Sequence, residues 1–244
     1  MLILLPPSEG KASEGSGPPV GDLSFPALGK PRTRVLNALV RASRRRDALE
    51  VLGLTPGLKG EPAKNAGLKT APTLPAAELY TGVLYDNLGL GTLAADARSR
   101  AEESVLIFSG LWGVVRITDR IPPYRLSMGV SLPPLGGLAA FWRPLLAKEL
   151  DRLPGLVVDL RSATYAAAWQ PGDRAVTVRV FRDGKVVSHM AKATRGEIAR
   201  ALLESGADPA TPGELAKHLT ARGYAVELTA PPRPSRPWTL DVAL

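Results

Sequence analysis

The stretch from residue 104 to residue 129 constrains the fold more than any other part of this sequence. It opens with residues 105–108 (VLIF), an apolar run that is typical of a strand buried on both faces. Directly after the run, Gly110 and Gly113 bracket apolar residues, and glycine lets the backbone turn sharply or approach another segment closely. The pattern predicts a central buried strand with a tight turn at its carboxyl end.

Polar side chains follow that predicted strand and gather around Pro122 and Pro123: Arg116, Asp119, Arg120, Tyr124 and Arg125. Proline fixes φ and restricts the residue before it, so residues 121–123 are predicted to be stiff and extended. A stiff segment beside the end of a buried strand is a common way to build a binding site. The structural alternative, in which Arg116 and Asp119 form a surface ion pair and Tyr124 fills a gap, stays open.

The rest of the chain alternates between strand and helix patterns. Buried strands are predicted at residues 2–5 and 156–160, and a β-hairpin at residues 175–191 with its turn at Asp183 and Gly184. Helices are predicted at residues 32–52, 92–103, 141–153, 194–205 and 211–223, with closing strands at 224–229 and 238–244. These elements predict an α/β (α+β) fold, a single domain over residues 1–244 with a mixed, partly antiparallel sheet surrounded by helices. A helical, hairpin-like insertion is expected at about residues 32–80.

The charge balance of the chain favours an anionic partner. The 244 residues carry a formal net charge of +8, and the sequence pI is near 10.0. Nucleic acid is the commonest polyanion in a cell, although nucleotides and other phosphorylated small molecules are equally anionic. A second explanation is that the arginine content, together with much Ala, Gly and Pro, reflects a GC-rich genome.

Other compositional features narrow the setting. The chain has no cysteine, which excludes disulfides and thiolate catalysis. No window approaches the roughly 18 unbroken apolar residues of a membrane span, and the first residues lack the pattern of a signal peptide. We therefore expect a cytoplasmic protein without a membrane partner.

Two neighbouring segments are candidates for binding DNA through its backbone phosphates. The predicted helix at 32–52 carries a basic face that includes Arg41, Arg44, Arg45 and Arg46. Residues 52–67 (LGLTPGLKGEPAKNAG) then resemble the hairpin of a helix-hairpin-helix, and they bring Lys59 and Lys64. Such a hairpin holds phosphates without reading bases. The alternative is that these cations form an ordinary solvated face.

Three further places are candidates for binding a small anion. Ser8 and Lys11 follow the first predicted strand, and Tyr80 begins a hydroxyl-rich turn. Thr194 and Glu197 have the spacing of a capping box, which predicts a helix that begins at Thr194. Lys192 and Arg195 would then flank a helix N-terminus, where cations do not help the helix but would hold a bound anion.

Several of these segments together resemble one family over nearly the whole chain: MLILLPPSEGK, Tyr80-Thr81-Gly82, SGLWGVVR, PYRLSMG, Phe141-Trp142, DLRSATY and AKATRG. They are similar to the signature of the YaaA family, bacterial proteins of the peroxide stress response. The resemblance implies a protein that binds DNA and protects it during oxidative stress. The family is also associated with limiting free intracellular iron. Nothing in this sequence has the pattern of an iron site, so any such effect is expected to be indirect.

The chemistry of the sequence leaves two hypotheses open. The two histidines, His189 and His218, lack metal-ligand spacing, and there is no nucleophile elbow or dinucleotide fingerprint, so no cofactor or metal is predicted. The first hypothesis is a DNA-binding protein of the hydrogen peroxide response. The alternative is an enzyme or binding protein for a nucleotide, nucleobase or other small anion. Its pocket would use Ser8, Lys11, Tyr80, Arg116, Asp119, Tyr124, Arg125, Lys192 and Arg195. In that pocket Arg125 and Lys192 would hold the anion, and Asp119 or Tyr124 would transfer a proton.

Overall fold

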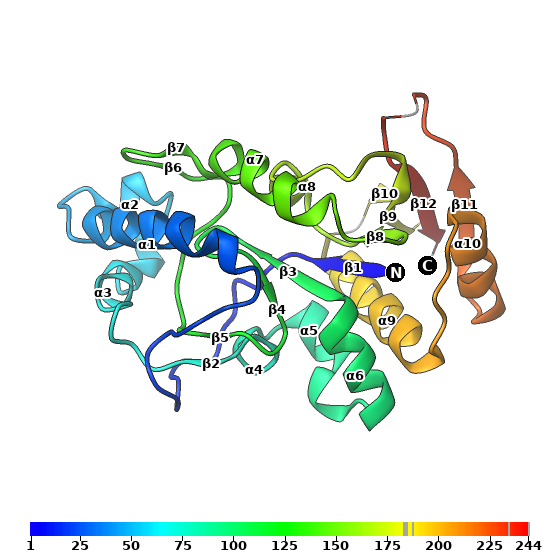
Figure 1. Ribbon diagram of the computed structural model, residues 1–244, viewed down its shortest axis with the longest axis horizontal. Helices are drawn as coiled ribbons and strands as arrows, with labels where there is room; N and C mark the ends of the chain where they lie inside the picture. Colours follow the sequence, from blue (N-terminus) through cyan, green and yellow to red (C-terminus); the bar gives the residue numbers. More distant parts are fainter. Residues whose placement is uncertain (183–184, 187, 234, 244) are drawn as a thin grey trace.

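A mixed sheet forms the centre of the molecule in the computed structural model, which describes residues 1–182, 185–186, 188–233 and 235–243. Figure 1 shows the sheet running between two groups of helices. In spatial order its strands are β11 (Ala225–Thr229), β12 (Trp238–Ala243), β9 (Ala175–Arg182), β8 (Val157–Asp159), β1 (Leu2–Leu5), β3 (Val105–Ser109) and β4 (Gly113–Arg116), and β10 (Lys185–Val186) pairs with β9. Two short ladders lie apart from it, one between β2 (Leu74–Pro75) and β5 (Arg120–Ile121), and one between β6 (Ser131–Leu132) and β7 (Gly136–Gly137).

The interior strands of the sheet are parallel, and its margins are antiparallel. β1 pairs in parallel with β3 and with β8, and the parallel pairing continues through β9 to β12. β4 and β11 pair antiparallel at the two ends of the strand order. Every residue of β1, β3 and β8 is buried, as expected for parallel strands covered on both faces. The predicted α/β fold class with a mixed sheet is confirmed.

Helices cover both faces of this sheet. Their bounds are α1 (Gly29–Ser43), α2 (Ala48–Val51), α3 (Glu61–Ala66), α4 (Ala76–Leu79), α5 (Val83–Leu88), α6 (Ala95–Ser104), α7 (Leu138–Leu150), α8 (Ala163–Ala166), α9 (Ser188–Ser205) and α10 (Pro212–Ala221), with 3-10 turns η1 (Pro26–Leu28), η2 (Pro56–Leu58), η3 (Leu90–Thr92) and η4 (Gly172–Arg174). In Figure 1, α5, α6 and α9 gather on one side of the strands and α7 and α8 on the other. Their apolar residues and those of the sheet form one continuous buried cluster. Among the described residues, no helix combines the length and the apolar character that crossing a bilayer requires.

Two predicted helices differ from the structure. The predicted helix at 32–52 is two helices, because α1 ends at Ser43 and the chain turns before α2 begins at Ala48. The helix predicted to begin at Thr194 begins at Ser188 instead, so Thr194 lies buried inside α9 and caps nothing. Packing against the rest of the molecule overrides the local capping pattern there, because α9 runs along α5 and covers the sheet.

The buried strands predicted at 2–5 and 156–160 are β1 and β8. The hairpin predicted at 175–191 is present as the antiparallel pair β9–β10, but its second strand is shorter than predicted, because β10 covers Lys185–Val186 and α9 begins at Ser188. Its turn residues, Asp183 and Gly184, lie outside the described residues. Thr211 caps α10 as predicted, since its side chain accepts a hydrogen bond from the Glu214 amide.

The order of the strands creates a switch point between β1 and β8. From β1 the chain crosses to β3 on one side, whereas from β8 it continues to β9 on the other side. Where neighbouring parallel strands send their connections in opposite directions, a crevice opens at their carboxyl ends. The loops that follow Leu5 and Asp159 border this crevice, so the fold itself marks the place to look for a ligand site.

Candidate functional site: a cation-lined cavity at the switch point

A cavity of about 490 Å³ lies at the carboxyl ends of β1 and β8, within the range of about 300–1,000 Å³ that small-molecule sites occupy. We call it the switch-point cavity. Four segments line it: residues 6–11 after β1, residues 82–85 at the start of α5, residues 125–127, and residues 162–165 after β8, together with Lys192 and Arg195 from α9. Its charged lining residues are four cations (Lys11, Arg125, Lys192 and Arg195) and one acid (Glu9). This imbalance favours an anionic ligand.

The loop after β1 is held in place by the segment that leads into α5. Lys11 and Tyr80 form an antiparallel bridge, and the Ala12 amide donates to the Leu79 carbonyl at 2.9 Å. The Ser8 hydroxyl donates to the carbonyl of Thr81. Gly82 has φ = +96°, a conformation that favours glycine, and this turn brings the start of α5 to the cavity. The sequence prediction placed Ser8, Lys11 and Tyr80 in one site, and these contacts bring them together.

Lys11 occupies an unusual position for a lysine. Its ammonium donates to the Ser8 carbonyl at 2.6 Å and lies over the rings of Tyr124, at 4.8 Å from the centroid, and Tyr80, at 5.5 Å. No carboxylate within the described residues forms an ion pair with it. Burial, together with the nearby charge of Arg125, lowers the pKa of Lys11 from 10.5 to about 8. A fraction of the Lys11 amines is therefore neutral near physiological pH.

Arg125 is fixed through its backbone by a residue from α3. The side chain of Asn65, fully buried, accepts from the Arg125 amide at 2.9 Å and donates to the Arg125 carbonyl at 2.8 Å. The guanidinium of Arg125 reaches the loop after β1, where it donates to the Glu9 carbonyl at 3.2 Å and to the Glu9 carboxylate at 3.3 Å. Because the Glu9 side chain is 85% exposed, an entering anion competes with it at little cost.

Lys192 and Arg195 reach the cavity from the interior of α9 and not from its N-terminus. The predicted helix-end site is therefore wrong, although both cations line the cavity. α9 lies close to α5 at Gly196, where an added Cβ would come within 2.2 Å of the Leu84 carbonyl oxygen. This close approach brings Lys192 and Arg195 to the cavity that the start of α5 also lines.

Arg195 carries an unused hydrogen-bond donor. Its Nε is buried and has no hydrogen-bond partner in the described part of the chain, while one terminal nitrogen donates to the Val178 carbonyl at 3.4 Å. Burial lowers the pKa of Arg195, and the charge of Asp159 partly offsets that effect. A buried donor without a partner is costly, so the side chain of Arg195 is held in its place at the expense of stability.

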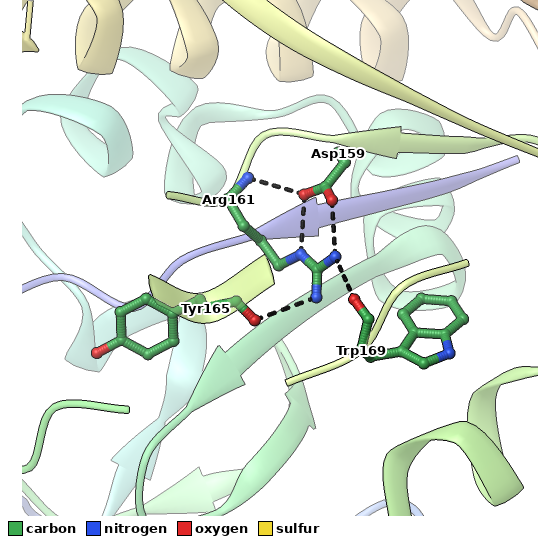
Figure 2. A network of polar contacts seen from close by, with 4 residues as sticks. All are labelled: Asp159, Arg161, Tyr165 and Trp169. Carbon is green, nitrogen blue, oxygen red and sulfur yellow. Dashed lines mark hydrogen bonds and ion pairs between the residues drawn. The ribbon is translucent and has the colours of Figure 1, made fainter. Parts of the chain in front are cut away.

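A fully buried ion pair supports the wall of the cavity after β8 (Figure 2). Arg161 donates from Nε to Asp159 at 2.8 Å and from a terminal nitrogen to the other Asp159 oxygen at 2.6 Å. The same guanidinium donates to the carbonyls of Trp169, at 2.9 Å, and Tyr165, at 3.4 Å, and lies 4.1 Å from the centroid of the Phe108 ring. All these groups are satisfied internally, so Arg161 positions the wall and leaves ligand contact to its neighbours.

Hydroxyl groups complete the lining: Ser8, Ser127, Ser162, Thr164, Tyr85 and Tyr165. The sequence prediction missed most of them as site residues, although Ser162 and Tyr165 directly follow a predicted buried strand, which was the available signal. The Tyr85 hydroxyl donates to the Pro6 carbonyl at 2.7 Å. Burial raises the pKa of Tyr85 and of Tyr165, so both phenols stay protonated at neutral pH.

Tyr80 and Tyr124 form a buried layer beneath Lys11 and do not line the cavity. Their hydroxyls lie 2.9 Å apart, and the Tyr124 hydroxyl lies 2.6 Å from the Ser109 Oγ. Burial raises the pKa of each phenol well above its ordinary value. Their rings support the Lys11 side chain, and proton transfer by Tyr124 stays a prediction.

Arg116 and Asp119 lie outside the switch-point cavity. The Asp119 carboxylate accepts from the Ser24 amide at 2.8 Å, the Ser24 hydroxyl at 2.9 Å and the Arg116 amide at 2.8 Å. The Arg116 guanidinium donates to the carbonyls of Glu102 and Glu103 at the end of α6. These contacts hold loops and a helix end, and neither residue lines the cavity.

The residues predicted to bind DNA lie in a second region, at the far side of Figure 1 from α10. Arg41, Arg44, Arg45, Arg46, Lys59 and Lys64 are all exposed, and we call them the basic surface. Arg45 pairs with Asp47 through two hydrogen bonds of 2.7 Å, and Lys64 pairs with Glu61 at 2.9 Å. Arg32, also in α1, is not part of the basic surface. Its side chain is buried and donates hydrogen bonds to the carbonyls of Trp112 and Val114.

The segment between α2 and α3 contains the 3-10 turn η2 and joins two short helices of four and six residues, so the predicted resemblance to a helix-hairpin-helix stays a prediction. At Gly57 and Gly60 an added Cβ would meet no atom within 4 Å, so the hairpin backbone is open to close approach from solvent. α1 packs against α3, which places the basic end of α1 and the hairpin on one subassembly. Among the described residues no cluster of His, Asp or Glu has the composition of a metal site.

Comparison with known proteins connects this geometry to one group of relatives. Residues 1–229 match the family described as peroxide stress protein YaaA. A UPF0246 protein of Streptomyces coelicolor is 55% identical, with 99% of this chain and 98% of that protein aligned. UPF0246 proteins of Corynebacterium efficiens (43% identity, 93% and 95% covered) and Methylibium petroleiphilum (35% identity, 82% and 84% covered) are also similar. The similarity includes both the switch-point cavity and the basic surface.

Proposed function

The chain belongs to the peroxide stress protein YaaA family, and from that premise we propose that it is a cytoplasmic protein that binds DNA backbone phosphates during oxidative stress. The family description supports the role in peroxide stress. The observation that carries DNA binding is the basic surface: four arginines gather at the end of α1 and beside it, next to an open hairpin with two lysines. Such a surface attracts phosphates without reading base sequence.

Binding of this kind gives a physical route to protection. Double-stranded DNA holds a condensed atmosphere of cations, and a protein that neutralises phosphates releases them. Iron(II) ions are among the cations that phosphates attract, and peroxide reacts where the iron is held. Protein bound through the basic surface would displace iron from the DNA without chelating it. This route needs no metal site in the protein.

DNA binding across a salt series tests this proposal. A variant with Arg44, Arg45 and Arg46 all replaced by alanine is expected to bind duplex DNA more weakly and with a shallower salt dependence. Each lost phosphate contact should lower the slope of log K against log salt by about 1. The matched control replaces Lys217, Arg222 and Arg236, which are exposed on and after α10 at the other end of the molecule.

The control removes the same charge from a different place. If both triple variants lose affinity equally, net charge explains the binding and the basic surface has no special role. If the wild-type protein shows no salt-dependent binding, the proposal as a whole fails.

We also propose a second function for this chain, the binding of a small anion in the switch-point cavity. The specific observation is the charge of the cavity lining, in which Lys11, Arg125, Lys192 and Arg195 face a single acid, Glu9. Calorimetric titration with ribose 5-phosphate, compared with ribose, tests it. Arg195→Gln should weaken binding of the phosphorylated sugar, whereas Arg236→Gln should not. Equal binding of both sugars by the wild-type protein would contradict an anion site.

A further inference from the structure

We propose that Lys11 is a nucleophile that forms an imine with the aldehyde of a phosphorylated sugar bound in the switch-point cavity. The inference rests on the second function proposed above, because the phosphate must first be held by the cavity cations. It assigns a reacting group to the site and names the class of ligand. It adds an activity that is separate from phosphate tracking on the basic surface.

The surroundings of Lys11 suit an amine that reacts as the free base. Its nitrogen hydrogen-bonds to one backbone carbonyl, lies against two aromatic faces and has no carboxylate partner in the described part of the chain. Lysines become nucleophilic when they are desolvated or placed next to another cation. Both conditions hold here, because Lys11 is largely removed from water and the charge of Arg125 destabilises its ammonium form.

Removing the Lys11 ammonium group from water destabilises the folded chain, and a residue with a purely structural role would not need this desolvation. A lysine that only packed between Tyr80 and Tyr124 would be replaced by methionine without loss, since methionine fills a similar volume and has no charge to desolvate. Carboxylates that would keep the lysine charged are weakly placed, because Glu9 is exposed and Glu61 pairs with Lys64. The surroundings of Lys11 therefore favour the neutral amine, which is the nucleophilic form.

The rest of the cavity fits a sugar phosphate. Arg125, Lys192 and Arg195 provide guanidinium and ammonium donors for a phosphate dianion. Hydroxyls from Ser127, Thr164 and other residues can meet sugar hydroxyls, and Pro6 and Val83 supply an apolar wall. About 490 Å³ accommodates a pentose phosphate with room for a neighbouring group.

The covalent step balances without any additional reagent. The lone pair of the neutral Lys11 nitrogen attacks the aldehyde carbon, and the carbonyl π electrons move to the oxygen, which takes up a proton. That proton comes from the nitrogen, which leaves a neutral carbinolamine. The carbinolamine hydroxyl then takes a proton from solvent and leaves as water while the nitrogen lone pair forms the C=N bond, which gives a protonated imine. No oxidant, reductant or metal takes part. Hydride from an added borohydride would reduce the imine to a stable secondary amine, which makes the intermediate detectable.

The same chemistry is available from two sources. Free pentose phosphates in their open-chain form present an aldehyde and a phosphate on one small molecule. An abasic site in DNA presents the aldehyde of a deoxyribose whose neighbours are phosphates. One residue connects the cavity to the hairpin of the basic surface. Asn65, in α3, holds the backbone of Arg125 through two hydrogen bonds. The experiment therefore includes both sources as separate arms.

Borohydride trapping tests the proposal directly. The intact protein is incubated with ribose 5-phosphate, or with a duplex that contains one abasic site, reduced, digested and analysed by peptide mass spectrometry. The adduct is expected on Lys11. It should be absent in Lys11→Met and Lys11→Arg and present in Lys217→Met, which removes an exposed lysine of α10 outside both regions. Circular dichroism and thermal melting confirm that each Lys11 variant is folded.

Two further readouts separate reaction from incidental glycation. Trapping at subsaturating ribose 5-phosphate should fall about tenfold in Arg195→Gln, the effect of one charge-assisted hydrogen bond, whereas trapping of unphosphorylated ribose should not change. The trapping rate should rise with pH and level off above about 8, where the Lys11 amine is free.

Each outcome has a definite meaning. An adduct on Lys11 with the free sugar phosphate supports a metabolite as ligand, and an adduct mainly with the abasic duplex supports damaged DNA. Adducts spread evenly over exposed lysines, or trapping unchanged in Lys11→Met, would overturn the inference. If ribose 5-phosphate binds by calorimetry but no adduct forms, the covalent step is wrong and the anion site stands. If ribose 5-phosphate does not bind and neither source gives an adduct on Lys11, the anion site fails as well.

Discussion

The switch-point cavity and the basic surface are both rich in cations, yet their cations are held in opposite ways. On the basic surface Arg41, Arg44 and Arg46 are exposed, so they remain hydrated and interact through screened, long-range attraction. In the cavity, burial lowers the pKa of Lys11 and Arg195. A hydrated cation suits a polyanion that can slide, whereas a desolvated cation suits one ligand in one geometry. Net charge alone does not distinguish these two regions.

The comparison also separates two kinds of ion pair. Arg161 and Asp159, on the wall of the cavity, are almost fully removed from solvent. Arg45 and Asp47, on the basic surface, form an equally short pair in water. Breaking the first pair is costly because neither buried charge can be hydrated instead. Breaking the second pair costs little because water hydrates both exposed groups.

The largest effect is expected from breaking the buried pair. Arg161→Ala leaves the Asp159 carboxylate buried without its partner and removes the donors to two carbonyls. Removal of one partner of a buried pair costs about 3–5 kcal/mol of unfolding free energy. Urea denaturation measures it. Arg45→Ala, the matched change on the basic surface, should leave the urea midpoint nearly unchanged. Equal losses would show that exposure does not decide the strength of these pairs.

The second prediction uses the pH dependence of stability to detect the desolvated Lys11 amine. In the folded chain Lys11 releases its proton near pH 8, whereas the unfolded chain holds it until about 10.5. Between these values the unfolded state binds more protons, so the unfolding free energy rises with pH. Relative to Lys11→Met, the gain from pH 7 to pH 10.5 should reach at most about 3 kcal/mol.

Urea denaturation of wild type and Lys11→Met at several pH values measures this difference. The control, Lys59→Met, retains the buried amine and should follow the wild-type pH dependence. A constant difference between wild type and Lys11→Met across the range would mean that Lys11 is fully solvated, and the contrast between the two regions would disappear at this residue.

The third prediction concerns the residue that links the two regions. Asn65→Ala removes both hydrogen bonds that hold the Arg125 backbone, and leaving two such groups unpaired should cost about 2–4 kcal/mol. Because Asn65 belongs to α3, we expect weaker binding of ribose 5-phosphate and also a change in DNA affinity. Calorimetry and a DNA titration on one preparation measure both. A loss confined to one ligand would show that α3 does not couple the regions.

Much of the framework for the cavity could be predicted from sequence. Residues 2–5 and 105–108 are continuous apolar runs, and the polar residues after them mark the carboxyl edge of a parallel sheet. The residue types therefore pointed to Ser8, Lys11 and Arg125. Local pattern also sufficed for Thr211, because its capping contact involves only residues three positions apart.

What failed depended on contacts between distant segments. Asp119 and Arg125 have the same character in the sequence, yet Asp119 holds Ser24, 95 residues away, while Arg125 lines the cavity. Thr194 and Glu197 have capping-box spacing, but α9 continues through them because it packs against α5. Spacing cannot tell which of two polar clusters fastens a loop and which lines a cavity. Only the packing of the completed fold decides that.

The smallest expected effect comes from a change without any charge. Replacing glycine by alanine inside a helix normally stabilises it by about 1 kcal/mol. At Gly196 the new Cβ would lie 2.2 Å from the Leu84 carbonyl oxygen and 3.0 Å from Asn87, and both belong to α5. We therefore expect Gly196→Ala to destabilise the chain by about 1–3 kcal/mol through overpacking. Gly213→Ala in α10, where an added Cβ meets nothing within 4 Å, is the control and should be neutral or slightly stabilising.

This substitution tests whether geometry or charge makes the cavity. Pushing α9 away from α5 moves Lys192 and Arg195 but leaves the number of cations in both regions unchanged. Binding of ribose 5-phosphate should weaken, while the salt dependence of DNA binding should match wild type, because the phosphate contacts of the basic surface are unchanged. If ribose 5-phosphate binds Gly196→Ala as well as wild type, the cavity attracts anions by charge density alone. The two regions would then differ only in how exposed their cations are, and the position of Arg195 would not affect the binding of ribose 5-phosphate.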